Sequence, residues 1–484
     1  MTIEAIEATR QLGAWAAALR WEHVPRPVQD RLRLILIDTL GVMTVGAREP
    51  EQRRLVVAWH PTPGSAPLVG GNFLTTAETA AWLNATALVR LELDEGHKYA
   101  KGHPAAHGFP AVLALAAETN ATGHDTMAAL LTCYEVAARF GRATQLRPGA
   151  HPHGSWGVAG AAAGCARLLA LGPDQMAAAI DTGAGMPIAG HFSSALDGNP
   201  VRDAWMSASN MSGIAAARMA AANVARNTGT AALSLGQLLG EFDPGALTDS
   251  LGQRWDLSSG YFKRHASCSF THPAADAALA IREAITPAQV ASIDEIRVET
   301  HSLAVGLGRT SWNERLSALF STPFVVAAAL HHGNVHPAVS SVEQLQDPAV
   351  RSLAAKVTIA KSDNLDARLP DKRGARVTIR IGESEHVVEV PNPIGDSAFH
   401  PMGETEILSL LHSLLGDSAA VETIRSVVDA IPASREVAPL LQQLAAIKTS
   451  REPTNRPMRG KYAYLCRDTH PRGRSGAGPT PGTL

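Results

Sequence analysis

Residues 92–110 read ELDEGHKYAKGHPAAHGFP and divide two stretches that we expect to be helical. The stretch before them, AETAAWLNATALVRLEL at residues 77–93, consists mainly of good helix formers, and apolar residues dominate again from about Pro110. Three acids therefore end one helix, and a loop with glycine and proline carries three histidines to the next. Histidine titrates near neutral pH, so this junction is a candidate source of acid and base groups. A solvated connecting loop is the alternative interpretation.

A helical pattern extends outward from this junction. Pro25-Arg26-Pro27 precedes VQDRLRLILIDTLGVMTVGA at residues 28–47, whose apolar residues favour one side of a helix. Glycines recur in another predicted helix, and because no strand precedes them we interpret them as allowing close helix packing rather than phosphate binding. Those glycines are Gly157, Gly160 and Gly164. Further helices are predicted at residues 124–142, 155–171, 173–185 and 206–223.

The pattern changes after about Lys263. Residues 292–305, SIDEIRVETHSLAV, alternate as a strand does, with Ile296, Val298 and Thr300 on one face. Two further segments, KVTIAKSD at 356–363 and ARVTIRIGESEHVVEV at 375–390, are rich in β-branched residues, and residues 382–385 look like a hairpin loop. A helical segment at residues 320–333 lies between these strands. Helical character returns from about Gly403 to Ile447.

These patterns predict a mainly α fold with a smaller α+β unit. We expect the helical domain to comprise residues 1–262 and 398–465, and the α+β domain to comprise residues 263–397. Residues 466–484 are rich in Gly, Pro, Ser and Thr without apolar periodicity, which predicts a disordered tail.

Composition narrows the class of protein. Among 484 residues, 43 Lys+Arg balance 45 Asp+Glu, so no polyanionic partner such as nucleic acid is expected. The N-terminus lacks a signal pattern, and the apolar stretches are too short or too rich in Ala and Gly to cross a bilayer. Four cysteines without CxxC spacing favour reduced thiols. We therefore predict a soluble cytoplasmic protein. The cysteines are Cys133, Cys165, Cys268 and Cys466.

A second histidine cluster lies in RPGAHPHGSWG at residues 147–157. His151 and His153 flank a proline just before a predicted helix start, where the helix dipole attracts anions. We expect this position to lower the proton affinity of the histidines. A capping loop with surface histidines is the alternative.

Two further segments carry cations. YFKRHASCSFTHP at residues 261–273 contains adjacent basic residues that suit a carboxylate ligand. We interpret Cys268 within it as a buried structural thiol, because no oxyanion-hole motif accompanies it. Arg202 lies near a predicted helix start and is a candidate anion anchor, an ordinary solvated first turn being the alternative.

Metal binding is a competing interpretation of so many histidines. HEXXH and the cysteine-containing zinc spacings are absent from the sequence, so no metal site is predicted. A site assembled in the fold from scattered ligands stays open.

In their order along the chain, these clusters resemble the MmgE/PrpD family over about Ala5 to Ala445. The resemblance is carried by an acidic helix end, two His-Pro elements, a basic helix start, a Phe-Lys turn, and a helix that begins His-x-x-x-Asp-Ala. A segment from Leu316 also resembles a helix of the family's smaller domain. The matching residues are Glu92-Leu-Asp94-Glu95-Gly96-His97, His103-Pro104, His151-Pro-His-Gly154, Arg202, Phe262-Lys263 and His272-Pro-Ala-Ala-Asp276-Ala.

The resemblance implies roles for individual residues. Catalytic roles fall on His103, His151, Lys263 and Asp94. Substrate-binding roles fall on Glu92, Gly96, His97, Arg202, His153 and His272. Three positions depart from the decarboxylase-like members: Gly96 and His153 stand where threonine is expected, and Arg202 where lysine is expected. His107 matches no family element, and we expect it on a surface loop.

The resemblance also implies a function. We expect a lyase that needs no cofactor and acts on a small di- or tricarboxylate by removing a proton next to a carboxylate. A dehydratase similar to 2-methylcitrate dehydratase is favoured over a decarboxylase. The alternatives are an epimerase of a small dicarboxylate such as iminodisuccinate, a metal-dependent hydratase, and a polycarboxylate-binding protein without activity. The expected architecture is a homodimer of chains with a large helical domain and a smaller α+β lid, with the site between these domains.

Overall fold

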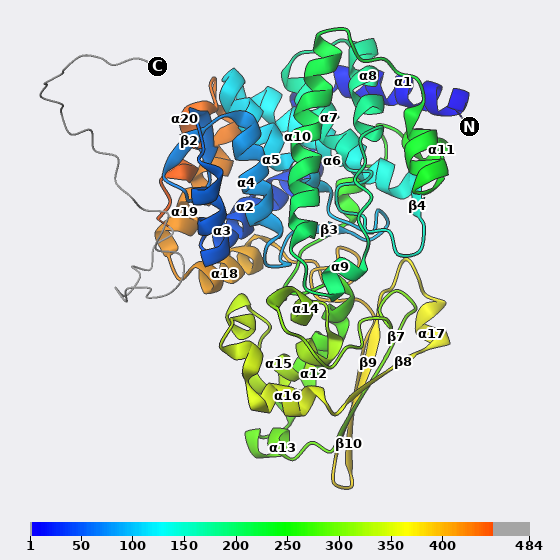
Figure 1. Ribbon diagram of the computed structural model, residues 1–484, viewed down its shortest axis with the longest axis vertical. Coiled ribbons are helices and arrows are strands. Elements are labelled where there is room, and N and C mark those ends of the chain that lie inside the picture. Colours follow the sequence, from blue (N-terminus) through cyan, green and yellow to red (C-terminus); the bar gives the residue numbers. More distant parts are fainter. Residues whose placement is uncertain (1, 449–484) are drawn as a thin grey trace, which may run out of the picture. The chain divides into compact units, whose positions relative to one another are not determined.

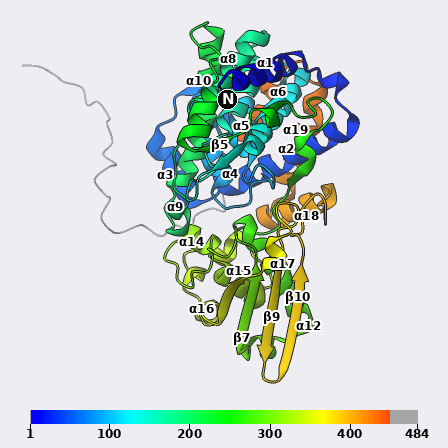
Figure 2. The same ribbon diagram turned by 90° about the vertical axis from the view of Figure 1, so that its right-hand side faces the viewer.

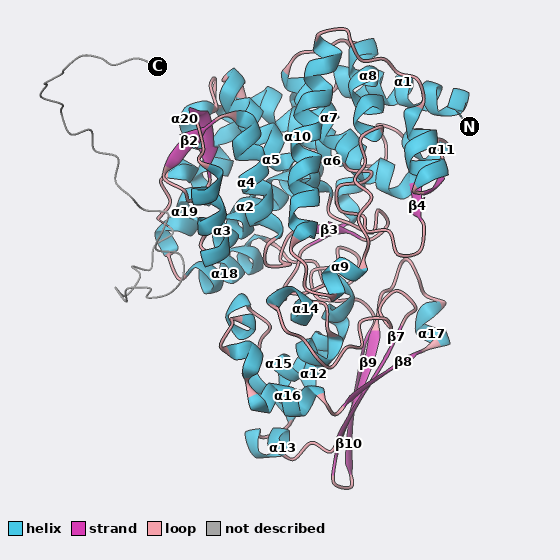
Figure 3. Cartoon of the chain, viewed as in Figure 1, coloured by secondary structure: helices cyan, strands magenta, loops and turns pink. Residues whose placement is uncertain are grey.

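The computed structural model describes residues 2–448, which belong to one packed unit (Figures 1 and 3). Their buried apolar residues form two large hydrophobic cores and a small third cluster that includes Phe320. The larger core joins residues from both ends of this range, and the smaller one joins residues from its middle. The fold is mainly helical with a smaller mixed sheet, as predicted. The tail predicted at residues 466–484 lies outside the described residues.

Helices from before and after the smaller core form the larger core and surround it. They are α1 (Thr2–Ala18), α2 (Arg26–Ala47), α3 (Pro50–Trp59), α4 (Ala77–Val89), α5 (Pro104–Thr119), α6 (Gly123–Ala143), α7 (Val158–Leu168), α8 (Pro173–Ala184), α9 (Ser193–Leu196), α10 (Val201–Ala221), α11 (Gly245–Thr248), α18 (Glu404–Leu415), α19 (Ser418–Ala430) and α20 (Ala438–Ala445). Three short pairs of strands accompany them: β1 (Pro63–Leu68) with β2 (Phe73–Thr75), β3 (Gly96–His97) with β6 (Gly260–Tyr261), and β4 (Thr144–Leu146) with β5 (Gly240–Phe242).

Helix α2 connects the two ends of the chain. Proline in its first turn suits a helix start, and its residues 35–46 are all buried. Helices α18 and α19 return to pack against it. A Cβ atom on Gly41 would lie 2.4 Å from a methyl carbon of Leu411, so glycine is required where α2 and α18 meet. The helical return after Gly403 is therefore confirmed.

The glycines of the predicted helix at residues 155–171 serve close packing, as expected. A Cβ atom on Gly160 would lie 2.5 Å from the Cβ of Ala137, and one on Gly164 would lie 2.6 Å from Val112. Helix α7 therefore lies against α5 and α6 with little space between the backbones. It begins only at Val158, so residues 151–157 form an irregular segment at its N-terminal end.

The smaller core is covered by a four-stranded sheet and several helices. The strand order is β10-β9-β7-β8, in which β7 and β8 are parallel and the other pairs antiparallel. Figure 2 shows β7, β9 and β10 side by side. Ile296, Val298 and Thr300 are buried on one face, as the alternation predicted. The elements are β7 (Glu295–Thr300), β8 (Val357–Lys361), β9 (Ala375–Ile381), β10 (Ser384–Val390), α12 (His272–Ala284), α13 (Pro287–Ala291), α14 (Arg315–Leu319), α15 (Thr322–His332), α16 (Pro348–Ala354) and α17 (Asp363–Asp366).

The hairpin between β9 and β10 is tighter than predicted. Only residues 382 and 383 connect the strands, because Gly382 adopts a left-handed conformation with φ of 57°. Its backbone N–H donates to Asp294 Oδ2 at 2.7 Å, which fixes the turn against the neighbouring segment.

Ion pairs connect the two parts of the chain that form these cores. Lys98 Nζ lies 3.3 Å from Asp396, and Arg315 pairs with Glu49. Ala266 still belongs to the larger core, whereas Ala274 belongs to the smaller one. The change from one core to the other therefore falls between Ala266 and Ala274. The boundaries at residues 262/263 and 397/398 stay predictions.

Across residues 2–448, the helices that reach 18 residues are not apolar enough to cross a membrane.

Candidate active site

Three acids from the loop after α4 are buried next to one another. Glu92, Asp94 and Glu95 are each no more than 2% exposed. Glu92 has a φ of 54°, a left-handed conformation that is uncommon for a residue with a side chain. Buried carboxylates must be paired with cations or hold a proton, because removing their charge from water is costly. The surroundings of these three decide which state each adopts.

Two buried cations neutralise Glu92 and Asp94. Arg202 Nη1 lies 2.5 Å from Glu92 Oε1, and Lys263 Nζ lies 3.0 Å from Glu92 Oε2 and 3.6 Å from Asp94 Oδ1. Burial raises the pKa of Glu92, but the charges of Arg202 and Lys263 outweigh it and hold this pKa at about 2. Burial lowers the pKa of Lys263, but Glu92 and Asp94 raise it above its usual value. Lys263 is therefore a fixed positive charge.

A short strand pair brings Lys263 to the acids. Gly96 of β3 pairs with Tyr261 of β6, which places Lys263 two residues beyond the pair. A Cβ atom on Gly96 would lie 2.3 Å from the Tyr261 hydroxyl oxygen. Gly96 therefore makes room for the Tyr261 ring, which explains why threonine is not accommodated at this position.

His103 precedes α5 and presents one nitrogen to the acidic loop. Its Nδ1 donates to the Glu95 carbonyl oxygen at 2.6 Å and lies 3.1 Å from Asp94 Oδ2. We assign the proton of the neutral ring to Nδ1 from these contacts, which leaves a lone pair on Nε2. Burial lowers the pKa of His103, and Asp94 opposes this effect. The ring is neutral at neutral pH and able to accept a proton at Nε2.

His151 and His153 belong to the irregular segment before α7. His151 Nδ1 accepts the backbone N–H of His153 at 3.1 Å, so its neutral ring carries the proton on Nε2. That Nε2 is buried and has no hydrogen-bond partner among the described residues. Burial, reinforced by the charge of Arg202, lowers the pKa of His151 to about 3. The lowered proton affinity that we expected is present, but burial causes it rather than a helix terminus.

His153 links the histidines to the cations. Its ring centroid lies 4.4 Å from that of His151 and 5.1 Å from that of His103. Arg202 Nη1 approaches His153 Nδ1 at 3.4 Å, and burial holds the pKa of His153 well below its usual range. The three histidines, two acids and two cations are adjacent in one buried group, which we call the acid–histidine cluster. Its members are Glu92, Asp94, His103, His151, His153, Arg202 and Lys263.

Aromatic side chains cover this cluster, and no role was predicted for them. Phe192 stacks on His151 with ring centroids 5.3 Å apart, and Trp205 lies 5.4 Å from the same ring. Phe320, from the smaller core's part of the chain, lies 5.8 Å from the Arg202 guanidinium carbon. Nothing in the sequence signals Phe192 or Phe320, since each is a single apolar residue far along the chain.

A cavity of about 520 Å³ contains no member of the cluster, but it is lined by Asp203, which follows Arg202 in the chain. Arg90 and Asp203 line it from the helical part and pair with each other at 2.9 Å. Glu314 and Arg315 line it from the other part of the chain. Asp203 Oδ1 also lies 3.4 Å from Arg202 Nη2, so one residue of the cavity wall contacts the cluster.

His97 and His272 were predicted to bind substrate, but their contacts lie elsewhere. His97 Nδ1 accepts the backbone N–H of Ala100 at 3.1 Å, and Nε2 donates to the Asp256 carbonyl oxygen at 2.9 Å. His272 Nε2 donates to the Ser267 carbonyl oxygen at 3.2 Å. Both rings are buried and hold the backbone near the cluster rather than joining it.

Other residues of these segments also contact partners outside the cluster. His107 was expected on a surface loop, which is wrong: it is fully buried in α5, with a hydrogen bond to Ser209 Oγ at 3.0 Å. Cys268 is buried as expected, and burial raises the pKa of its thiol to about 12. Lys98 pairs with Asp396, and Lys101 donates to Gln145 at 2.6 Å. The two lysines of the loop therefore have partners outside the cluster.

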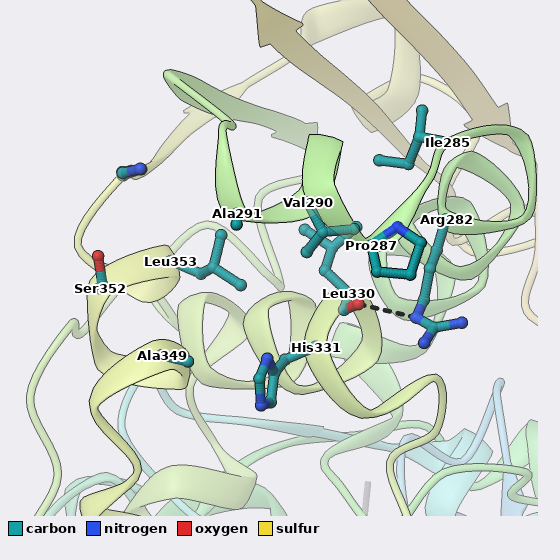
Figure 4. Close-up of a pocket in the computed structure, with 11 residues that line it drawn as sticks. Arg282, Ile285, Pro287, Val290, Ala291, Leu330, His331, Ala349, Ser352 and Leu353 are labelled. Atoms are coloured by element: carbon teal, nitrogen blue, oxygen red, sulfur yellow. Dashed lines mark hydrogen bonds between the residues drawn. The ribbon is translucent and has the colours of Figure 1, made fainter.

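Within residues 2–448, only one group of three side chains brings potential metal-ligand atoms within 4.8 Å of one another, and it lies outside the cluster. A separate cavity of about 370 Å³, between α12, α13, α15 and α16, is lined by residues such as Ile285 and Leu353 and contains no member of the cluster (Figure 4).

Comparison with known proteins identifies similar sequences over most of the chain. Residues 10–225 match the family model of the MmgE/PrpD N-terminal domain, and residues 265–431 match that of the MmgE/PrpD C-terminal domain. Cis-aconitate decarboxylase of Aspergillus terreus is 25% identical over 474 residues, covering 90% of this chain and 95% of the relative. The cis-aconitate decarboxylase-like protein oryM of Aspergillus oryzae is 26% identical over 469 residues, covering 90% and 96%. Lys263 falls between the two matched segments.

Proposed function

The chain belongs to the MmgE/PrpD family, and from this premise we propose that it is a lyase acting on a small di- or tricarboxylate without a cofactor. The preferred reaction is dehydration that starts with removal of a proton next to a carboxylate. The observation that carries this proposal is the hydrogen bonding of two histidine rings on either side of His153, from which we assign opposite tautomers. His103 offers a lone pair at Nε2, whereas His151 offers an N–H at Nε2.

Each member of the cluster has a role in this proposal. His103 Nε2 accepts the proton from carbon, and Asp94, 3.1 Å from Nδ1, stabilises the imidazolium that results. Lys263 and Arg202 stabilise the negative charge that develops on the substrate carboxylate. Glu92 holds these two cations together.

The leaving group departs as water. His151 donates a hydrogen bond from Nε2 to the leaving hydroxyl, as a neutral imidazole does when it acts as an electrophile. The proton on His103 passes to the departing hydroxide, so the carbon–hydrogen and carbon–oxygen bonds break, a carbon–carbon double bond forms and the enzyme returns to its starting state. His153, Gly96, His97 and His272 remain proposed as residues that shape the substrate site.

Decarboxylation of an unsaturated tricarboxylate is the second candidate. The similar proteins named as cis-aconitate decarboxylases support it. Here a proton replaces the lost carbon dioxide on the substrate carbon, and the same histidines supply it. Gly96 and Arg202 differ from the decarboxylase-like pattern, which is why we place dehydration first.

Proton NMR in deuterated water tests both candidates. The enzyme, treated with chelator, is mixed with citrate, 2-methylcitrate, cis-aconitate, malate and an aspartate-derived imine. Formation of an alkene from a hydroxy acid supports dehydration, and loss of carbon dioxide from cis-aconitate supports decarboxylation. Deuterium exchange without net conversion points to an epimerase. No change with any compound contradicts the proposal.

We also propose that the protein is a homodimer that works in the cytoplasm. Three free, buried cysteines, Cys133, Cys165 and Cys268, are compatible with a reducing compartment. Light scattering coupled to size exclusion tests the dimer, and a mass equal to one chain contradicts it.

A further inference from the structure

Two histidines and an aspartate meet at the surface of the α+β part, away from the acid–histidine cluster. His331 and His332 end helix α15, and Asp347 immediately precedes helix α16. His331 Nε2 lies 3.5 Å from Asp347 Oδ2, and His332 Nε2 lies 4.0 Å from the same oxygen. Among residues 2–448, this is the group whose three potential ligand atoms lie within 4.8 Å of one another.

The carboxylate of Asp347 is oriented by the backbone. Its Oδ1 accepts the N–H of Ala349 at 2.8 Å and so caps α16. The other oxygen, Oδ2, is the one that faces both imidazoles. One oxygen is therefore fixed by the helix, and the second is available to a ligand.

The distances suit a shared cation. Zinc binds imidazole nitrogen and carboxylate oxygen at about 2.0–2.2 Å, which places ligand atoms roughly 3–3.6 Å apart around the ion. The 3.5 Å separation of His331 Nε2 from Asp347 Oδ2 lies within this range. The 4.0 Å separation of His332 Nε2 exceeds it by less than half an ångström, which a small rotation of the side chain closes. His332 Nε2 is also buried without a hydrogen-bond partner among the described residues. A buried polar atom of this kind calls for a partner.

The group is partly exposed, and nearby cations do not fill it. The side chains of His331, His332 and Asp347 are 37%, 20% and 21% exposed. His331 also lines the cavity drawn in Figure 4. On that cavity wall, Arg282 Nε donates to the Leu330 carbonyl oxygen at 2.8 Å, shown as a dashed line, and Lys356 donates to the Ile293 carbonyl oxygen.

We propose that His331, His332 and Asp347 form a binding site for a divalent transition-metal ion, with zinc as the best match. Two imidazoles and one carboxylate are ligands that such ions prefer, and water completes the coordination. The ion connects the end of α15 to the start of α16 and stabilises the α+β part. The site is separate from the proposed lyase chemistry, so either proposal stands without the other.

Zinc titration of the full chain tests this site. The protein, free of any polyhistidine tag and stripped with chelator, is titrated by calorimetry, and its zinc content after dialysis is measured by elemental analysis. We expect the wild type to bind one equivalent of zinc and to keep it after dialysis, and the double variant His331→Ala/His332→Ala to lose it on dialysis. The zinc affinity of the double variant should be reduced more than about 100-fold, since changes outside the ligand shell alone cost 10–100-fold. Zinc should also raise the Tm of the wild type, and not that of the double variant.

Two further variants make the result specific. Asp347→Asn keeps a capping oxygen for α16 but removes the charged ligand, and it should weaken zinc binding with little change of Tm in chelator. His386→Ala, on β10 of the same part, should bind zinc as the wild type does. The proposal is overturned if the wild type binds no zinc, or if the double variant retains the wild-type stoichiometry and affinity. Loss of the zinc on His103→Gln instead would assign it to the acid–histidine cluster.

Discussion

Two groups of histidines place the same side chain in opposite surroundings. His103, His151 and His153 are buried among acids and cations, whereas His331 and His332 form the end of helix α15 beside one carboxylate. Burial keeps the first group neutral, and backbone contacts give His103 and His151 opposite tautomers. The second group is partly exposed and shares one carboxylate oxygen. The same imidazole therefore serves proton transfer in one place and suits metal binding in the other, because burial and fixed partners decide its state.

The largest expected effect on turnover and stability comes from removing the positive charge of Lys263 in the acid–histidine cluster. Lys263→Met leaves Glu92 and Asp94 buried with one countercharge fewer. We expect turnover to fall at least about 10³-fold and stability to fall by about 3–5 kcal/mol. Turnover by NMR and urea unfolding measure the two effects.

The matched control for Lys263 is a lysine of the acidic loop. Lys101 is exposed and donates to Gln145, so Lys101→Met should change turnover and stability little. Near wild-type turnover of Lys263→Met would show that the buried charge has no catalytic role.

The next largest effect on turnover is expected from replacing His103, the proposed base. His103→Gln should lower kcat/KM by about 10²–10⁴-fold, and exposed His124 offers a control in His124→Gln. In the wild type, kcat/KM should fall as the pH falls, because protonation removes the lone pair of His103. Since burial lowers the pKa of His103, the midpoint should lie below its ordinary value of 6.5. A midpoint above 6.5 would assign the base to another group.

A smaller effect tests the backbone that holds the cluster. Gly96→Thr should destabilise the protein by about 1–3 kcal/mol, because its Cβ meets the Tyr261 ring. Gly96→Ala should show much of the same loss, since the Cβ atom itself causes the clash. Thermal unfolding measures both. A stable Gly96→Thr that gains decarboxylase activity would show instead that this position selects the reaction.

Burial of Glu95 makes the stability of the protein depend on pH. Burial raises the pKa of Glu95 from 4.5 to about 8, although Ala105 N–H and the Tyr134 hydroxyl donate to it. Between these pH values the folded state holds a proton that the unfolded state has released, so stability falls as the pH rises, by at most ~1.4 kcal/mol per pH unit. Glu95→Gln should flatten this fall in urea titrations from pH 5 to 8. An unchanged slope would mean that Glu95 is ionised in the folded protein.

The smallest effect is expected at the exposed group. In the presence of chelator, His331→Ala/His332→Ala should change the free energy of unfolding by no more than about 0.5 kcal/mol, as surface substitutions usually do. The corresponding loss in a buried His153→Ala variant should be larger, because it leaves a cavity and unpaired polar groups. Equal losses of unfolding free energy in the two variants would show that the two groups of histidines do not differ in their contribution to stability.

The sequence predicted the elements better than their contacts. The helix around Leu36 and the alternation of Ile296 and Val298 were identified because local periodicity reflects burial on one face. The clusters containing Glu92 and His151 were also found, because unusual residue types mark them. His107 was misplaced, since a histidine in a Gly/Pro-rich stretch gives no sign of whether its ring is buried.

The sequence by itself determined the fold class, the family resemblance and the residue types available for chemistry. The folded structure decides which nitrogen of His103 and His151 carries the proton, and which backbone groups His97 and His272 contact. It also brought Phe320 to Arg202 and Asp347 to the His331–His332 pair. Periodicity and motifs are local properties of the chain, whereas tautomers and pKa values depend on atoms that folding brings together from distant residues.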